Sequence, residues 1–446
     1  MSHLRYESYK DSGVEWLGEV PEHWEVKRLR FLLSMNPSKT EIGEAPDNQK
    51  VSFLPMEAVG EDGSLNLETE REIKDVLNGY TYFAEGDITF AKITPCFENG
   101  KGAVMQGLKN GFGFGTTELT VMRPTGKNLS TYLWYVTKSL AFRRIGESYM
   151  YGAGGQKRVP DDFVRNFTWA APPLPEQKSI ASYLARETSR IDSLISEQKE
   201  LIALLKEKRQ ALISHTITKG LDPDVTMKDS GVEWLGMVPE HWEVKRLKYL
   251  GDAITGLTYS PNDIVDEEYQ GNKKLVLRST NIQDRRISLH ENVFVSCKIP
   301  KELLTQFGDI LICSRNGSRN LVGKNAMITA LEQMTFGAFT TVFRSKHNDF
   351  LFYVFNSELF EHQSSGFLTT TINQLTIGNL NSMVVPLPPL PEQQSIASYL
   401  DKETSKIDNL IKEAESTIIL MQEHRAALIS AAVTGKIKVP DVVAEV

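Results

Sequence analysis

The sequence has few cysteines and no long hydrophobic run. Its three cysteines (Cys96, Cys297 and Cys313) form no CxxC pair, which argues against a disulfide framework and against a cysteine-based zinc site. No apolar stretch approaches the ~20 residues that a membrane-spanning helix requires. The first residues, MSHLRYESYKDSG, are polar and lack the apolar segment of a signal peptide. We therefore expect a cytoplasmic protein.

Sequence motifs of catalysis are also missing. The chain has no GxxxxGK[ST] phosphate loop, no GxGxxG after a strand, no HExxH and no GxSxG, and its eight histidines lack metal-ligand spacing. The string Asp192, Glu197 and Lys199 has a nuclease-like spacing, but charge pairs along a predicted helix account for it. We expect a chain that catalyses nothing alone and binds neither a metal nor a cofactor.

Charge is distributed unevenly along the chain. The net charge is −7, yet residues 86–170 hold 11 Lys and Arg against 6 Asp and Glu, and residues 269–330 hold 10 against 4. Two basic segments in an acidic frame fit a protein that contacts a polyanion at two places. From charge alone, chance unevenness of solvated surfaces is an equal alternative.

Two long segments occur twice. KDSGVEWLGEVPEHWEVKRL (10–29) returns at 228–247 with one difference, Glu19 against Met237. PPLPEQKSIASYLARETSRIDSLI, from Pro172, returns as PPLPEQQSIASYLDKETSKIDNLI from Pro388. The chain therefore reads A–X–B–A–Y–B, where X and Y are similar in length but diverged. A period above 200 residues excludes a solenoid and indicates duplication with pseudo-twofold symmetry.

Blocks X and Y have mixed α/β patterns. Alternating or short apolar runs predict strands, namely 51–59, 86–93 and 119–124 in X, and 274–280, 308–314 and 340–345 in Y. Amphipathic stretches predict one helix at 130–145 and another at 349–363. The echo between EGDITFAKITP (85–95) and FGDILICSRNG (307–317) indicates one fold used twice.

Segment B predicts a long helix in each copy. Pro175 and Pro391 suit a helix start, and no Pro or Gly occurs between Glu176 and Lys219. Apolar residues recur with a period near 3.5, which is typical of a coiled coil. About 40 helical residues would span roughly 60 Å. We expect the two helices to pair with each other.

The tryptophans of segment A are predicted to be packing anchors rather than ligand contacts. They are Trp16, Trp24, Trp234 and Trp242, two in each copy. Because A precedes each diverged block, it is placed to close that block onto the helix that leaves it. The repeated twenty residues then serve two equivalent positions.

This layout, with PPLPEQ at 172–177 and LPPLPEQ at 387–393, resembles the specificity subunit of type I restriction–modification systems. The resemblance covers nearly the whole chain. It implies that X and Y are target-recognition domains and that B forms helical spacers. The spacers would dock modification (adenine methyltransferase) subunits, two in number, and through them restriction subunits. Catalysis, S-adenosylmethionine, ATP and Mg would belong to those partners.

The predicted fold is α+β, with two α/β target-recognition domains joined by two long antiparallel coiled-coil helices in a pseudo-twofold internal repeat. The expected segments are an N-terminal repeat segment (1–29), recognition domain 1 (30–171), helical spacer 1 (172–220), a linker with the second repeat segment (221–247), recognition domain 2 (248–387), helical spacer 2 (388–436) and a C-terminal tail (437–446).

The resemblance implies sequence-specific recognition of double-stranded DNA at an asymmetric bipartite target. Each domain would read one half-site, and the helix pair would fix the gap, about one helical turn of ~34 Å or a multiple. Two alternatives stay open, a coiled-coil scaffold without DNA specificity and a stand-alone DNA-modifying enzyme. The basic segments lie on the diverged blocks, which speaks against the scaffold.

Candidate DNA contacts follow from side-chain chemistry. Arg and Lys hold phosphates or pair with guanine, while Asn and Gln pair with adenine. In X the candidates are Lys92, Lys101, Arg143, Arg144, Gln156, Lys157 and Arg158, the last three in the glycine-rich loop GAGGQKR. In Y they are Arg278, Asn281, Arg285, Arg286, Arg315, Arg319, Lys324, Asn373 and Gln374. Each of them, taken singly, is also explained as an ordinary surface charge or a phosphate contact.

Overall fold

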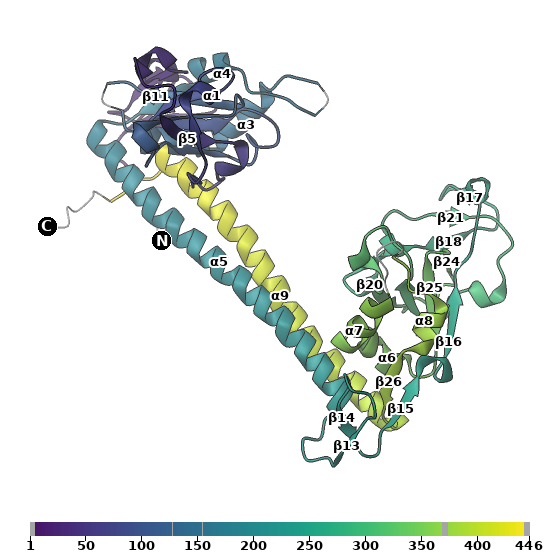
Figure 1. The fold of residues 1–446 in the computed structure, drawn as a ribbon. Helices are drawn as coiled ribbons and strands as arrows, with labels where there is room; N and C mark the ends of the chain where they lie inside the picture. The colour runs from purple at the N-terminus through teal and green to yellow at the C-terminus, as the bar shows by residue number, and fades with distance from the viewer. Residues whose placement is uncertain (1–4, 127, 154, 368–372, 441–446) are drawn as a thin grey trace. The chain divides into compact units, whose positions relative to one another are not determined.

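The computed structural model describes residues 5–126, 128–153, 155–367 and 373–440, which form two compact units (Figure 1). Unit 1 comprises Met1–Gln198 and Ser416–Val446, and unit 2 comprises Lys199–Glu415. Two long helices, α5 (Leu174–Lys219) and α9 (Leu390–Val433), each contribute to both units. Within the described ranges, no helix is long and apolar enough to span a membrane.

The repeated twenty residues form the same small elements in both units. They are the hairpins β1 (Tyr9–Asp11) with β2 (Glu19–Pro21), and β13 (Met227–Asp229) with β14 (Met237–Pro239). The strand that follows pairs with the strand before the long helix, β3 (Glu25–Arg28) with β12 (Thr168–Ala171) and β15 (Glu243–Arg246) with β26 (Val384–Leu387). The repeat therefore ties the start of each block to its end.

A four-stranded antiparallel sheet with one strand order occurs in both units. In unit 1 the order is β4 (Leu33–Met35), β11 (Leu119–Pro124), β8 (Ile88–Ala91) and β9 (Gly102–Val104). In unit 2 it is β16 (Asp252–Thr255), β25 (Thr340–Arg344), β22 (Ile310–Cys313) and β23 (Asn325–Met327). This shared order confirms that the two blocks have one fold.

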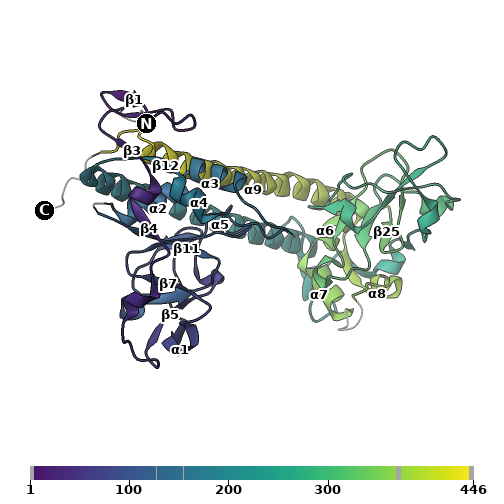
Figure 2. The same cartoon turned by 90° about the horizontal axis from the view of Figure 1, so that it is seen from above.

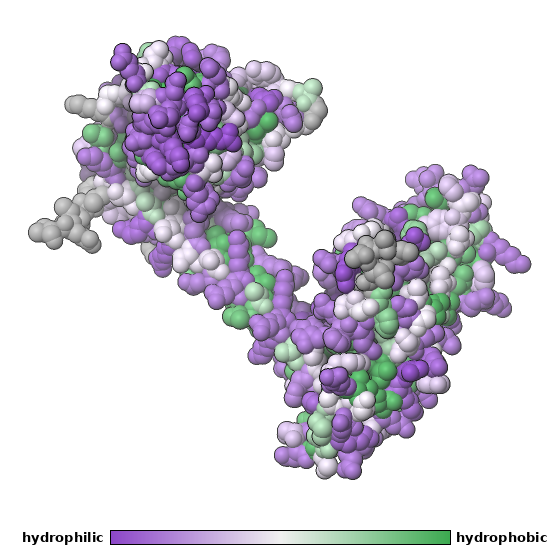
Figure 3. All heavy atoms as spheres, viewed as in Figure 1, coloured by the Kyte–Doolittle hydropathy of each residue, from purple (hydrophilic) through white to green (hydrophobic). Residues whose placement is uncertain are grey.

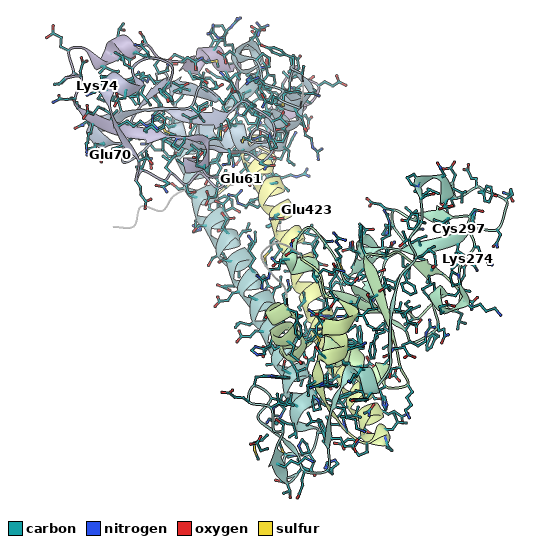
Figure 4. All side chains as sticks on the ribbon, turned by 45° about the vertical axis from the view of Figure 1, so that its right-hand side comes forward. Glu61, Glu70, Lys74, Lys274, Cys297 and Glu423 are labelled. Carbon is teal, nitrogen blue, oxygen red and sulfur yellow. The ribbon has the colours of Figure 1, made fainter. Side chains whose placement is uncertain are left out.

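A second four-stranded sheet in each unit contains one parallel pair. Its order is β6 (Glu70–Glu72), β5 (Lys50–Leu54), β10 (Phe112–Gly115) and β7 (Thr81–Ala84) in unit 1. In unit 2 it is β17 (Ile264–Val265), β21 (Phe294–Val295), β18 (Lys274–Leu277) and β24 (Thr335–Phe336), near the labels of Lys274 and Cys297 in Figure 4. A short hairpin, β19 (Ile282–Gln283) with β20 (Arg286–Ile287), lies beside β23 of the first sheet. All six predicted strands are present.

A Gly-Asp pair precedes both β8 and β22, and in each unit the aspartate has a structural role. The buried Asp87 carboxylate accepts hydrogen bonds from Arg123 Nε and Nη2 at 2.6 and 2.8 Å, and from the backbone N–H of Ala84 at 2.8 Å. Asp309 accepts from Arg344 Nε and Nη2 at 2.9 and 2.7 Å, and from a backbone N–H in the same way. A buried carboxylate is costly unless it is paired, so both blocks retain the arginine.

The prediction of one helix at 130–145 and one at 349–363 was wrong in its detail, because each stretch forms two helices. Unit 1 has α2 (Ser130–Lys138) and α3 (Leu140–Ser148), and unit 2 has α6 (Asn348–Phe355) and α7 (Glu358–Phe367). Ser139 interrupts the first pair, with extended backbone (φ −64°, ψ 147°) and an Oγ that accepts from the Phe142 N–H at 3.3 Å. Such a serine cap outweighs a continuous apolar pattern. Short helices α1 (Ile73–Val76), α4 (Asp161–Asn166) and α8 (Ile377–Ser382) complete the blocks.

Each unit packs against one part of α5 and one part of α9, which run side by side in Figures 1 and 2. In unit 1 the core includes Ile180 and Leu184 of α5 together with Ile429 and Val433 of α9. In unit 2 it includes Ile213 and Ile217 of α5 together with Ile396 and Leu400 of α9. The start of one helix thus packs with the end of the other, which confirms the predicted antiparallel pair.

Two of the four tryptophans predicted as packing anchors are buried, while the other two, Trp16 and Trp234, are 36% and 39% exposed and contact neighbouring rings. Trp24 and Trp242 are fully buried. Their neighbours His23 and His241 place Nε2 2.7 Å from the carboxylates of Glu176 and Glu392, at the starts of α5 and α9. Trp16 stacks on Phe167 and Trp169, with ring centroids 4.9 and 5.8 Å apart, and Trp234 lies 5.8 Å from His362. Segment A therefore fastens each block to the helix that follows it.

Candidate nucleic-acid interface

A two-stranded ladder brings several predicted DNA contacts together in unit 1. Residues 92–94, directly after β8, lie antiparallel to residues 157–159, directly before α4. The backbone N–H groups of Thr94 and Val159 donate across it at 3.0 and 2.8 Å. We call these six residues the ladder of unit 1.

Unit 2 contains the same ladder at the same place. Residues 314–316 follow β22 and lie antiparallel to residues 373–375, before α8. The backbone N–H groups of Asn316 and Leu375 donate across it at 3.3 and 2.8 Å. Because the backbone pattern is shared, the ladder belongs to the common fold, and its side chains are where the two blocks differ.

The side chains on the ladder of unit 1 centre on an ion pair. Ile93 and Arg158 are bridge partners, and Arg158 donates from Nε and Nη2 to the two carboxylate oxygens of Glu118 at 2.9 and 2.7 Å. This guanidinium lowers the pKa of Glu118 from its usual value. Lys157 is exposed and Lys92 is half-buried beside them. The backbone oxygen of Glu118 also accepts from the Lys92 N–H at 2.9 Å.

In unit 2 the equivalent position is filled differently. The bridge partners are Arg315 and Gln374, and the Arg315 guanidinium lies 5.5 Å from the ring centroid of Phe339. The backbone oxygen of Phe339 accepts from the Ser314 N–H at 3.0 Å, so Phe339 takes the place that Glu118 has in unit 1. Asn373 donates from its amide to the Gly317 carbonyl at 3.0 Å. One backbone position thus carries an acid in one unit and an exposed aromatic ring in the other.

A loop between Tyr151 and Arg158 extends from the ladder of unit 1, and we call it the arm. The backbones of Tyr151 and Arg158 exchange hydrogen bonds of 3.2 and 2.9 Å, and the chain between them carries the exposed Gln156. Gly152 has φ +145°, and a Cβ there would lie 2.4 Å from the Gln156 carbonyl, so only glycine fits. Tyr149 and Tyr151 are 59% and 68% exposed. In unit 2, residues 368–372 of the equivalent stretch lie outside the described residues.

Two predicted contacts of unit 1 are used inside the fold. Lys101 donates from Nζ to the Met56 carbonyl at 3.2 Å, and Arg143 donates from Nη1 to the Phe97 carbonyl. Burial lowers the pKa of Arg143 to about 10 and that of its neighbour Lys138 to about 7. These cations are therefore poorly placed to meet a phosphate from solvent.

Several predicted contacts of unit 2 also bind neighbouring protein groups. The hydrogen bonds run from Arg278 to the Glu291 carbonyl at 2.7 Å, from Asn281 to the Ser288 carbonyl at 2.9 Å, from Arg285 to Asn356 Oδ1 at 3.1 Å, from Arg319 to the Ser365 carbonyl at 3.2 Å and from Lys324 to the Ile282 carbonyl at 3.0 Å. Asn281 is fully buried, and its side chain holds its own loop together. Arg319 is exposed, whereas Arg278 is half-buried and its Nε is a buried donor without a partner among the described residues.

The remaining predicted contacts are free of such partners. Counting only partners among the described residues, no hydrogen bond or ion pair occupies the side chains of Lys92, Arg144, Gln156, Lys157, Arg286 or Gln374. Four of the six lie on the ladders or on the arm. Among the residues that the structure places, no group of three or more His, Cys, Asp or Glu could hold a metal ion.

Comparisons with known proteins agree on one family. Residues 239–418 match the family model described as the type I restriction modification DNA specificity domain. The type I restriction enzyme EcoAI specificity subunit of Escherichia coli is 40% identical over 228 residues, which cover 50% of this chain and 37% of that protein. The putative type I restriction enzyme MjaX specificity subunit of Methanocaldococcus jannaschii is 23% identical over 97% of both chains.

Structural similarity extends over nearly all of the chain. A chain from a structure that describes complex assembly and conformational transition of a type I R-M system has a TM-score of 0.75, with 18% identity, over 93% of this chain and 98% of that one. That likeness shows the fold. The chain spans about a third of the length of the EcoAI subunit and of a second E. coli relative, the type I restriction enzyme EcoEI specificity subunit, with 37% and 31% covered. In sequence over residues 239–418, and in fold over nearly all of its length, the chain is therefore similar to the specificity subunits of type I restriction–modification systems.

Proposed function

We propose that this chain recognises an asymmetric, bipartite site on double-stranded DNA, with one half-site read by each unit. One observation carries the proposal: the two units keep the same ladder backbone and change the side chains on it. Glu118 and Phe339 occupy equivalent backbone positions, but Glu118 pairs with Arg158 on the second segment of its ladder, whereas Phe339 contacts Arg315 on the first segment of the other. Two ladders with the same backbone but different hydrogen-bonding side chains are suited to read two different base sequences.

The chain would act in the cytoplasm as a non-catalytic subunit. We propose that two modification subunits dock on α5 and α9, and that restriction subunits join through them. Apolar side chains on the two helices support this, because exposed apolar groups mark contact surfaces. They are Leu201, Leu204 and Leu410 in unit 2, and Ile419 and Leu420 in unit 1, and green patches mark the helices in Figure 3. S-adenosylmethionine, ATP and Mg would be bound by the partners.

Methylation mapping tests the proposal directly. The chain is co-expressed with its modification subunit, and modified adenines are located across the host DNA. We expect a split motif with two unlike halves and a fixed gap. A soluble complex without any new motif would favour a scaffold that lacks DNA specificity. Methyl transfer by the purified chain alone, with S-adenosylmethionine and DNA, would favour a stand-alone enzyme.

An exchange of one block refines the test. Replacing residues 248–387 with the corresponding block of another specificity subunit should change one half of the motif and leave the other intact. Binding should also weaken steeply with salt, since phosphate contacts release counterions. Affinity that stays flat with ionic strength would again favour the scaffold.

A further inference from the structure

We propose that Arg158 reads a guanine in the half-site of unit 1, and that Glu118 holds its guanidinium in the reading position. The inference rests on the proposed function, because it assigns one base contact within that recognition. It concerns the ladder of unit 1, where the two residues meet although 40 positions separate them.

The hydrogen bonds leave the right donors free. Nε and one N–H of Nη2 are taken by the Glu118 carboxylate at 2.9 and 2.7 Å. Nη1 and the second N–H of Nη2 remain, and together they form the end edge of the planar group, next to the edge that holds the carboxylate. Two parallel donors match the O6 and N7 acceptors that guanine presents in the major groove. The Arg158 side chain is 41% exposed, so this edge is accessible.

The restraint distinguishes Arg158 from its basic neighbours. A guanidinium fixed by a bidentate carboxylate loses little further rotamer freedom on binding, which favours a directional base contact. The guanidinium lowers the pKa of Glu118, so the carboxylate stays ionised and the restraint persists at neutral pH. Lys92 and Lys157 have no such restraint from the described residues, and mobile ammonium groups suit the phosphates on either side.

The ladder of unit 2 offers a different set of donors, with Gln374 at the position equivalent to Arg158 and Arg315 at the position equivalent to Ile93. Arg315 stacks on Phe339, and no carboxylate among the described residues takes its N–H groups. Its bridge partner is Gln374, whose amide can pair with adenine. The two ladders therefore present unlike edges, and the base pairs read at the two equivalent positions should differ.

The experiment maps methylation by complexes that carry single substitutions in the full chain. Arg158→Lys keeps the charge but loses the paired N–H donors of the guanidinium, and Arg158→Gln removes the charge as well. Glu118→Gln removes the carboxylate charge that holds the guanidinium in place. Arg165→Gln, an exposed arginine on α4, is the charge-matched control. Thermal unfolding of each variant checks folding, and Arg158→Lys carries the test if Arg158→Gln unfolds.

The wild-type motif should contain a guanine in one half, and both Arg158 variants should lose discrimination at that position by roughly 10-fold to 100-fold. Glu118→Gln should relax the same position less, while the other half-site and the Arg165→Gln motif stay unchanged. An intact motif with uniformly weaker binding and a smaller salt slope would overturn the inference, since it identifies a phosphate contact. A wild-type complex without any motif would instead overturn the proposed function.

Discussion

Arg425 Nε lies 3.0 Å from Asp192 Oδ1, and this ion pair joins the end of α9 to the start of α5 within unit 1. Arg209 and Asp408 form the same pair in unit 2 at 2.8 Å. In both pairs the guanidinium is the more buried partner, with 17% and 9% of the arginine side chain exposed against 42% and 44% of the aspartate. The acidic residue that a sequence pattern linked to nuclease chemistry thus has a structural partner.

Removing the acid from such a pair should destabilise more than removing the base. Asp408→Ala leaves the buried Arg209 charge without its partner, at an expected cost of about 3 kcal/mol, whereas Arg209→Met should cost less because it removes the charge itself. Chemical denaturation of the three proteins measures the difference. Asp192→Ala is the matched variant in unit 1. Equal midpoints for Asp408→Ala and the wild type would contradict the prediction.

The buried carboxylates of Asp87 and Asp309 should be essential for the stability of the two blocks. Asp87→Asn removes the charge that pairs with Arg123 and should lower the free energy of unfolding by about 3 kcal/mol. Asp309→Asn should do the same in unit 2. Glu41→Gln is the control, because Glu41 contacts the same arginine from the surface and should contribute at most about 1 kcal/mol. A larger effect of Glu41→Gln than of Asp87→Asn would reverse this ranking.

Lys138 should make the stability of unit 1 depend on pH. Burial lowers its pKa to about 7, while in the unfolded chain a lysine titrates near ~10.4. Between these values the unfolded chain binds the extra proton, so stability rises with pH over this window. Lys138 donates to the carbonyls of Gly100 and of Glu61, which is labelled in Figure 4.

Melting curves of the wild type and of Lys138→Met, recorded from neutral to mildly alkaline pH, measure this contribution. The wild type should gain stability relative to the variant as the pH rises. Parallel curves would show that the ammonium group is not desolvated. Lys74→Met, which removes an exposed lysine, should leave the pH dependence unchanged.

Gly152 should be required for recognition by unit 1 more than for folding. Gly152→Ala places a Cβ 2.4 Å from the Gln156 carbonyl and must displace the arm. The expected result is loss of one half of the methylation motif with a small change in melting temperature. Gly155→Ala is the control, because a Cβ there has open space although φ is +76°. Similar motifs for both variants would show that the arm does not contact DNA.

Regular elements could be predicted from the sequence, because strand and helix periods are local signals. The prediction failed at Ser139, where one capping hydrogen bond decides between a continuous helix and a break. Arg158 and Arg315 could be predicted as candidates from their chemistry alone. Their placement could not, since the contact of Arg158 with Glu118 depends on sheet register across 40 residues.

The same limit explains the candidates that lie inside the fold. Lys101 and Asn281 have the chemistry of DNA contacts, and nothing in the sequence around them indicates that backbone carbonyls hold their donors. The echo between EGD and FGD was visible in the sequence. Only the structure shows that it marks a buried carboxylate and its arginine.

The sharing of α9 between the units has a consequence for biosynthesis. The core of unit 1 includes Leu428, Ile429, Val433 and Val439, whereas every residue of unit 2 precedes position 416. During synthesis on the ribosome, all residues of unit 2 are made before residues 416–446. Unit 1 begins first but still lacks the part of its core that α9 supplies. A premature stop after residue 415 would therefore leave the core of unit 1 incomplete, although unit 1 begins first, and would leave unit 2 with all of its residues.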